Sequence, residues 1–124
     1  MEKRTVLVVE DNPDNLDLIR YLMETAGYQV YTAEDGRQAL EQAQQRRPDF
    51  MLLDLTIPEI DGWDLARQLK AGADTAHIFI IALTGHAMPG DRKRALESGC
   101  DAYVTKPLDT PNFVHQVETL LSKA

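Results

Sequence analysis

Five short apolar segments recur along the chain and alternate with segments of helical periodicity, and this alternation constrains the fold more than any other feature. The apolar segments cover residues 5–10, 29–33, 49–54, 78–83 and 101–105. The first, third and fourth of them are almost unbroken runs of large apolar residues. Continuous rather than alternating hydrophobicity is typical of strands that are covered on both faces, as in a parallel sheet.

The intervening segments show the three- and four-residue spacing of helices. Apolar or small residues recur with this spacing over residues 16–26, 36–43 and 113–120, and more weakly over residues 91–98. Asn12 before Pro13 is typical of a helix start, and glycines stand where helices are expected to end, at Gly27, Gly72 and Gly99. The pattern is (βα)₅, which predicts an α/β fold with a doubly wound parallel sheet and right-handed crossovers. A chain of 124 residues is expected to form one domain, residues 1–124.

Composition excludes several classes of protein. The single cysteine, Cys100, cannot form an internal disulfide or a multi-cysteine zinc site, and we interpret it as a small buried apolar residue. No apolar run approaches the roughly 20 residues of a membrane span, and the chain does not begin with a signal-peptide pattern. We therefore expect a cytoplasmic protein without a membrane partner.

The formal net charge of −7 lies entirely in residues 1–62, which hold 13 acidic residues against 6 lysines and arginines. An acidic chain without a basic stripe is not expected to bind nucleic acid directly. The excess of acid either serves solubility alone or marks a cation site. Which of the two applies depends on where particular carboxylates fall in the fold.

Polar and charged residues stand at the carboxyl ends of the predicted strands, where doubly wound sheets place their functional crevice. In chain order they are Glu10 and Asp11, Asp54, Thr84, and Lys106 followed by Pro107. Three anions within ~5 Å repel by roughly 3 kcal/mol per pair at an effective dielectric constant of ~20, so protonation or a cation must relieve them. Oxygen ligands without histidine or cysteine favour Mg²⁺.

These strand ends carry a resemblance to a known family. The motifs are residues 8–12 (VVEDN), 52–55 (LLDL) with Pro58 and Gly62 following, 82–85 (ALTG) and 103–107 (YVTKP). Together they resemble the receiver domain of two-component response regulators over essentially the whole chain. The likeness is to single-domain, CheY-like regulators, and residues 87–91 and 99–103 also resemble the cell-cycle (DivK) kind. The resemblance implies a flavodoxin-like sheet with strand order 2-1-3-4-5.

The resemblance also implies a phosphorylation site. Asp54 would accept a phosphoryl group from the phosphohistidine of a sensor histidine kinase or a histidine phosphotransfer protein. Asp11, Asp54 and the backbone carbonyl of Thr56 would bind Mg²⁺, and Glu10 would act on the metal through a water molecule. Such a protein is not an enzyme with a separate substrate, because it catalyses only its own phosphorylation and slow autodephosphorylation.

Further residues would form the switch that the family implies. Thr84 would hydrogen-bond one phosphoryl oxygen, Lys106 would pair with another, and the bond before Pro107 would be cis. Tyr103 would swing inward when Thr84 moves, although ordinary half-buried packing is the alternative for this residue. A downstream target protein would bind the face formed by the fourth helix, fifth strand and fifth helix. Because nothing follows the fifth helix, we expect altered partner binding to be the output.

Two other interpretations remain open at this point. The same residues could be a receiver module excised from a hybrid kinase or a larger regulator. Alternatively, the chain could be a Mg²⁺-dependent phosphohydrolase that acts on small molecules through Asp54. Phosphatases of the haloacid-dehalogenase type place a second aspartate two residues after the first, where this chain has Thr56. Turnover separates the classes, because an enzyme releases many phosphates per protein and a receiver accepts one.

Overall fold

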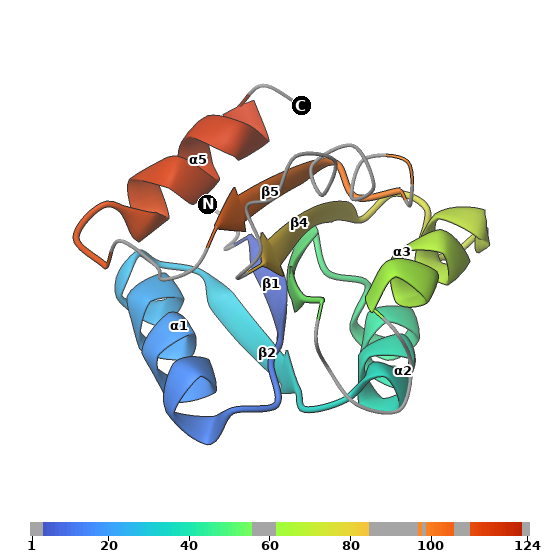
Figure 1. Cartoon of the computed structure of the whole chain (residues 1–124), viewed down its shortest axis with the longest axis horizontal. Coiled ribbons are helices and arrows are strands. Elements are labelled where there is room, and N and C mark those ends of the chain that lie inside the picture. The colour runs from blue at the N-terminus through green and yellow to red at the C-terminus, as the bar shows by residue number, and fades with distance from the viewer. Residues whose placement is uncertain (1–3, 56–61, 85–96, 98, 106–109, 123–124) are drawn as a thin grey trace.

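The computed structural model places a five-stranded parallel sheet at the centre of the molecule (Figure 1). The structure describes residues 4–55, 62–84, 97, 99–105 and 110–122. The strands are β1 (Thr5–Val9), β2 (Gln29–Ala33), β3 (Phe50–Asp54), β4 (Phe79–Thr84) and β5 (Ala102–Thr105). Their order across the sheet is β2-β1-β3-β4-β5, which confirms the predicted α/β fold and strand order.

Helices cover both faces of this sheet. On one face lie α1 (Pro13–Thr25) and α5 (Phe113–Ser122), and on the other lie α2 (Gly36–Arg46) and α3 (Gly62–Ala71) (Figure 1). The helix predicted over residues 91–98 falls, apart from Glu97, outside the described residues. Among the helices that the structure describes, none combines the length and the apolar character needed to cross a membrane.

Successive residues of the strands fill two cores, one on each face of the sheet. Leu7 and Met51 belong to the core under α2 and α3, whereas their neighbours Val8 and Leu52 belong to the core under α1 and α5. The central strand β3 is buried along its whole length. Burial on both faces is the reason that these strands are continuously apolar in the sequence.

The predicted start of α1 is confirmed, whereas the helical spacing in the sequence extends one residue beyond the helix. The side-chain oxygen of Asn12 accepts hydrogen bonds from the backbone N–H groups of Asp14 (2.9 Å) and Asn15 (3.1 Å), which caps the helix. Ala26 ends the apolar pattern in the sequence, but it lies exposed just beyond the last helical residue. The chain turns away there through Gly27, whose φ of +98° is a conformation that favours glycine.

Cys100 lies in the core under α2 and α3, as its interpretation as a small apolar residue predicts. Its exposed fraction is 3%, and it packs in the same cluster as Ala66 and Leu69 of α3. Burial, reinforced by the negative charge of Asp101 and opposed by Lys70, raises the pKa of the thiol from 9.0 to about 12. The folded protein therefore holds the thiol proton more tightly than the unfolded chain does.

This difference in thiol pKa predicts a loss of stability in alkaline solution. The unfolded chain releases the Cys100 proton near pH 9 and the folded protein near pH 12, so the free energy of unfolding should fall as the pH rises between these values. Between about pH 8 and about pH 10.5 the wild type should lose about 2 kcal/mol more than a Cys100→Ala variant does. Urea unfolding of both proteins measures the two losses. Equal losses would show that the buried thiol makes no contribution to the pH dependence.

Candidate functional site

The register of the parallel strands brings the carboxyl ends of β1 and β3 side by side. Val9 pairs with Leu53, and each is followed directly by a carboxylate, Glu10 after β1 and Asp54 at the end of β3. Asp54 in turn pairs with Leu83, the residue before Thr84 on β4. The residues that end three predicted strands therefore meet at one edge of the sheet.

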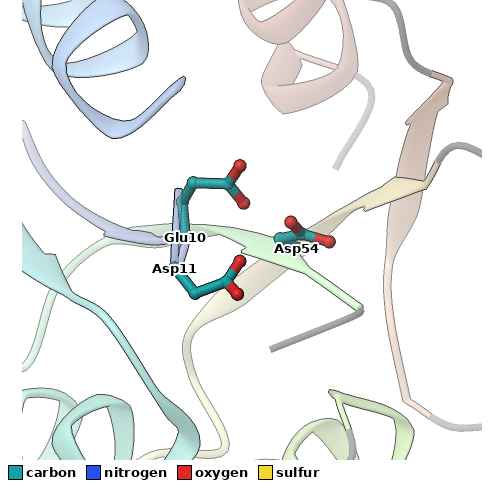
Figure 2. Close-up of side chains that lie close together, drawn as sticks. All are labelled: Glu10, Asp11 and Asp54. Atoms are coloured by element: carbon teal, nitrogen blue, oxygen red, sulfur yellow. The ribbon is translucent and has the colours of Figure 1, made fainter. Parts of the chain in front are cut away.

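Three carboxylates converge at this edge. One carboxylate oxygen from each of Glu10, Asp11 and Asp54 lies within 4.8 Å of the other two. Figure 2 shows the three side chains lying close together at the carboxyl ends of β1 and β3. Glu10 and Asp54 have exposed fractions of 1% and 3%, whereas Asp11 is exposed. The site is thus a buried acidic floor with one carboxylate at the solvent side.

Glu10 is held in place by its backbone and by its side chain. Its N–H donates to the carbonyl of Ala33 on β2 (3.0 Å), which continues the sheet one residue beyond β1. The side-chain amide of Asn15, in the first turn of α1, donates to its Oε1 (2.9 Å). The sequence motifs do not single out Asn15 as a site residue. Asn15 lies three residues after the capping residue Asn12, in the first turn of α1, and this position could have indicated that its side chain lies near the end of β1.

The donor set of this cluster fits a small, hard divalent cation. Carboxylate oxygens are the ligands that Mg²⁺ prefers, and this metal keeps several water molecules when a protein supplies few ligands. The converging carboxylates repel one another, and a divalent cation between them would relieve that repulsion. The carboxylates of Glu10, Asp11 and Asp54 therefore fit a hard divalent cation such as Mg²⁺, with Asp11 on the solvent side.

The structure places two other predicted site residues on the neighbouring strands. Thr84, 5% exposed, ends β4 and pairs with Thr105 of β5. Tyr103 lies on β5, is half-buried, and packs against the core under α2 and α3. The remaining predicted site residues, Thr56, Lys106 and Pro107, lie outside the described residues.

This arrangement of carboxylates at the strand ends agrees with a family match. A family model of the response regulator receiver domain matches residues 6–118. The chain belongs to this family. As a receiver domain of two-component response regulators, it has the fold and function class that the sequence motifs implied.

Relatives and solved structures agree with the assignment. The receiver is 38% identical over 121 residues to the polar-differentiation response regulator DivK of Brucella anthropi, covering 98% of both chains. It is 32% identical to the receiver domain of a sensor histidine kinase of Pseudomonas aeruginosa PAO1, whose structure has a magnesium ion coordinated in the active site cleft (TM-score 0.86, covering 98% of this chain and 99% of that one). The chemotaxis response regulator CheY4 of Vibrio cholerae, at 24% identity, shares the fold (TM-score 0.90, covering 96% of this chain and 99% of that one).

A close backbone approach holds the chain at the end of β3 against α3. A Cβ placed on Gly62, the first residue of α3, would lie 2.7 Å from the Cα of Leu55 and 2.9 Å from its carbonyl oxygen. Leu55 follows Asp54 directly, and its N–H donates to the carbonyl of Leu83 (3.2 Å). Only glycine at position 62 therefore allows this approach without a backbone shift beside Asp54.

We predict that Gly62→Ala displaces the backbone at Asp54. Overpacking of this kind costs about 1–3 kcal/mol, and the free energy of unfolding should fall by that amount. The NMR amide shifts of Asp54 and Leu55 should change as well. Gln68→Ala, at an exposed position of the same helix, is the control and should leave both quantities unchanged. A destabilised Gly62→Ala protein with unchanged shifts at residues 54 and 55 would contradict the prediction.

Proposed function

We propose that this receiver is a switch controlled by phosphorylation at Asp54. The phosphoryl donor is the phosphohistidine of a sensor histidine kinase or a histidine phosphotransfer protein, and the output is altered binding of a downstream protein. The observation that carries the proposal is the position of Asp54: a buried carboxylate at the end of the central strand, within reach of Glu10 and Asp11, in a chain of the receiver family.

The proposal assigns Mg²⁺ to the acidic cluster. Asp11, Asp54 and the backbone carbonyl of Thr56 would hold the metal directly, with Glu10 contributing through a water molecule. When bound, the metal offsets negative charge on the phosphoryl oxygens. Asn15 keeps the carboxylate of Glu10 turned toward the cluster through its 2.9 Å hydrogen bond.

The chemical step needs a nucleophile and stabilisation of the transferred charge. A carboxylate oxygen of Asp54 attacks phosphorus, so that a P–O bond forms and the P–N bond breaks, and the electron pair leaves with the imidazole nitrogen. Thr84 donates its hydroxyl to one phosphoryl oxygen and Lys106 pairs with another, which stabilises charge on the transferred group. The product is an acyl phosphate on the protein.

The output face is proposed to consist of the fourth helix, β5 and α5. Between β5 and α5 lies an open groove of about 550 Å³, lined by Tyr103 and Thr105 from the strand and by His115, Thr119 and Leu120 from the helix. Inward movement of Tyr103 would change this groove. The groove thus supports the proposal that a partner protein senses the state of the site here.

The extent and setting of the domain complete the proposal. We assign residues 1–124 to one receiver domain, of which the family match covers residues 6–118. We place the reaction in the cytoplasm, because kinases that form phosphohistidine draw on ATP. A receiver excised from a larger kinase or regulator would carry out the same chemistry at Asp54.

Asp54 should be the single phosphorylation site of the protein. With acetyl phosphate and Mg²⁺, intact-mass spectrometry should detect one added phosphoryl group, labile to base and to hydroxylamine because it is an acyl phosphate. Asp54→Asn should abolish the label, since an amide does not accept the group. Asp17→Asn, an exposed carboxylate of α1 outside the cluster, is the matched control and should be labelled as the wild type is.

Two outcomes would contradict this assignment. One is a label that persists in Asp54→Asn, which would place the acceptor elsewhere. The other is the release of many phosphates per protein from a simple phosphomonoester, because that result identifies a phosphohydrolase instead of a switch.

A further inference from the structure

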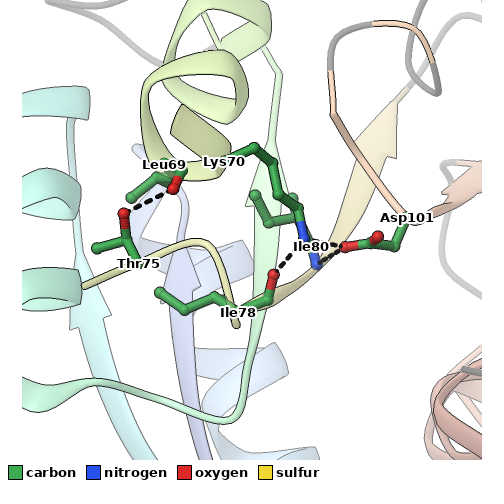
Figure 3. Close-up of polar contacts among 6 residues, drawn as sticks. All are labelled: Leu69, Lys70, Thr75, Ile78, Ile80 and Asp101. Atoms are coloured by element: carbon green, nitrogen blue, oxygen red, sulfur yellow. Dashed lines mark hydrogen bonds and ion pairs between the residues drawn. The ribbon is translucent and has the colours of Figure 1, made fainter. Parts of the chain in front are cut away.

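A half-buried ion pair lies at the opposite edge of the sheet from the carboxylate cluster. The Nζ of Lys70, near the end of α3, lies 2.7 Å from Oδ2 of Asp101, the residue before β5. The same Nζ donates to the carbonyl of Ile78 before β4 (2.7 Å). Figure 3 shows the side chain of Lys70 reaching from the helix to Ile78 and Asp101, the residues directly before β4 and β5. One ammonium group therefore links α3, β4 and β5.

Asp101 completes the start of the β4–β5 ladder. Its N–H donates to the carbonyl of Ile80 (2.8 Å), and its Oδ2 accepts from the N–H of Ile80 (2.8 Å). In a regular parallel ladder a backbone carbonyl would accept that second bond. Here Gly99, two residues before Asp101, has a φ of +104°, which is outside the range of a regular strand. The carboxylate takes the place of the strand carbonyl and fixes β5 in register on β4.

Neighbouring segments leave space for the side chain of Lys70 and hold the end of its helix. A Cβ on Gly99 would lie 2.9 Å from the Cγ of Lys70, so glycine leaves room for the lysine to pass. The hydroxyl of Thr75 donates to the carbonyl of Leu69 (2.6 Å), which holds the α3–β4 connection against the end of the helix (Figure 3). The end of the helix that carries Lys70 and the space for its side chain are thus set by contacts from separate segments.

Burial distinguishes this ion pair from the other pairs among the described residues. The side chains of Lys70 and Asp101 are 26% and 32% exposed, whereas those of Arg20 and Glu24, paired at 2.6 Å on α1, are 57% and 49% exposed. Exposed pairs contribute little to stability, and loss of one partner from a shielded pair leaves a poorly hydrated charge. The Arg20–Glu24 pair is therefore a matched control for the effect of burial.

We propose that Lys70 and Asp101 are positioning residues for the switch: they anchor the amino end of β5 to β4 and α3, so that movement at the site is confined to the carboxyl end of the strand. β5 is only four residues long, and among the strands that the structure describes it pairs with β4 alone. Tyr103 lies two residues beyond Asp101 and pairs with Ala82 in the register that Asp101 begins. This inference rests on the proposed role of Tyr103 as the residue that responds to Asp54.

The first test measures the anchor itself, without phosphorylation. In Asp101→Ala the Ile80 amide loses its acceptor, and its hydrogen exchange should be roughly tenfold faster because exchange follows local opening. Asp101→Asn keeps an acceptor oxygen and should give a smaller increase. The control variant Arg20→Met should leave the Ile80 amide unchanged. An unchanged exchange rate of the Ile80 amide in Asp101→Ala would contradict the proposal that Asp101 anchors β5 to β4.

The second test measures the response of Tyr103 to beryllofluoride with Mg²⁺, a mimic of the phosphorylated state. The NMR shift change of the Tyr103 ring should fall by roughly half or more in Lys70→Met, and Lys70→Arg should restore most of it because the cation is kept. The double variant Lys70→Met/Asp101→Asn removes both charges, so it should regain stability relative to Lys70→Met. Its Tyr103 response should nevertheless stay reduced, because the link to α3 is still missing.

The outcomes of the second test separate the two proposals. If the wild-type amide of Asp54 does not respond to beryllofluoride, the proposed function is wrong and the switch role of this pair is wrong with it. If Asp54 responds equally in all variants and the Tyr103 response follows stability alone, the proposed function stands and Lys70 and Asp101 have only a structural role.

Discussion

Repulsion among three carboxylates at one edge of a parallel sheet is the constraint on which the rest of this structure depends. The parallel register aligns the ends of β1 and β3. This alignment brings the carboxylates of Glu10, Asp11 and Asp54 close together. Two of them are buried, where solvent screens their charges least. Folding therefore creates a site at which a divalent cation would relieve the repulsion among the three carboxylates.

The elements around the carboxylate cluster contribute contacts that offset the repulsion or fix the backbone beside it. The amino terminus of α1 begins beside the cluster, and its partial positive charge favours the carboxylates that precede it. Asn15 hydrogen-bonds Glu10, and Gly62 lets α3 approach the backbone next to Asp54. At the far edge of the sheet, Lys70 and Asp101 hold β5 in place. The edge that holds the carboxylate cluster is thus crowded by negative charge, while the opposite edge carries an ion pair.

The parts of the site that depend on strand ends could be predicted from the sequence, and those that depend on tertiary contacts could not. Continuous apolar runs located the strands, and a parallel sheet then required Glu10, Asp54 and Thr84 to share an edge. The contact of Asn15 with Glu10 depends on the angle at which α1 leaves the end of β1, and the spacing of apolar residues does not predict that angle. The pairing of Lys70 with Asp101 joins elements whose contact exists only after the sheet has formed.

The most direct test of the central claim is the stability of wild type and Asp11→Asn as a function of Mg²⁺, measured by urea unfolding. If charge crowding dominates the site, the wild type should gain about 1.4 kcal/mol at a Mg²⁺ concentration ten times its Kd. Without Mg²⁺, Asp11→Asn should be more stable than the wild type because one repelling charge is gone, and added Mg²⁺ should have little further effect. An Asp11→Asn protein that is less stable than the wild type, or that responds to Mg²⁺ as the wild type does, would contradict the account.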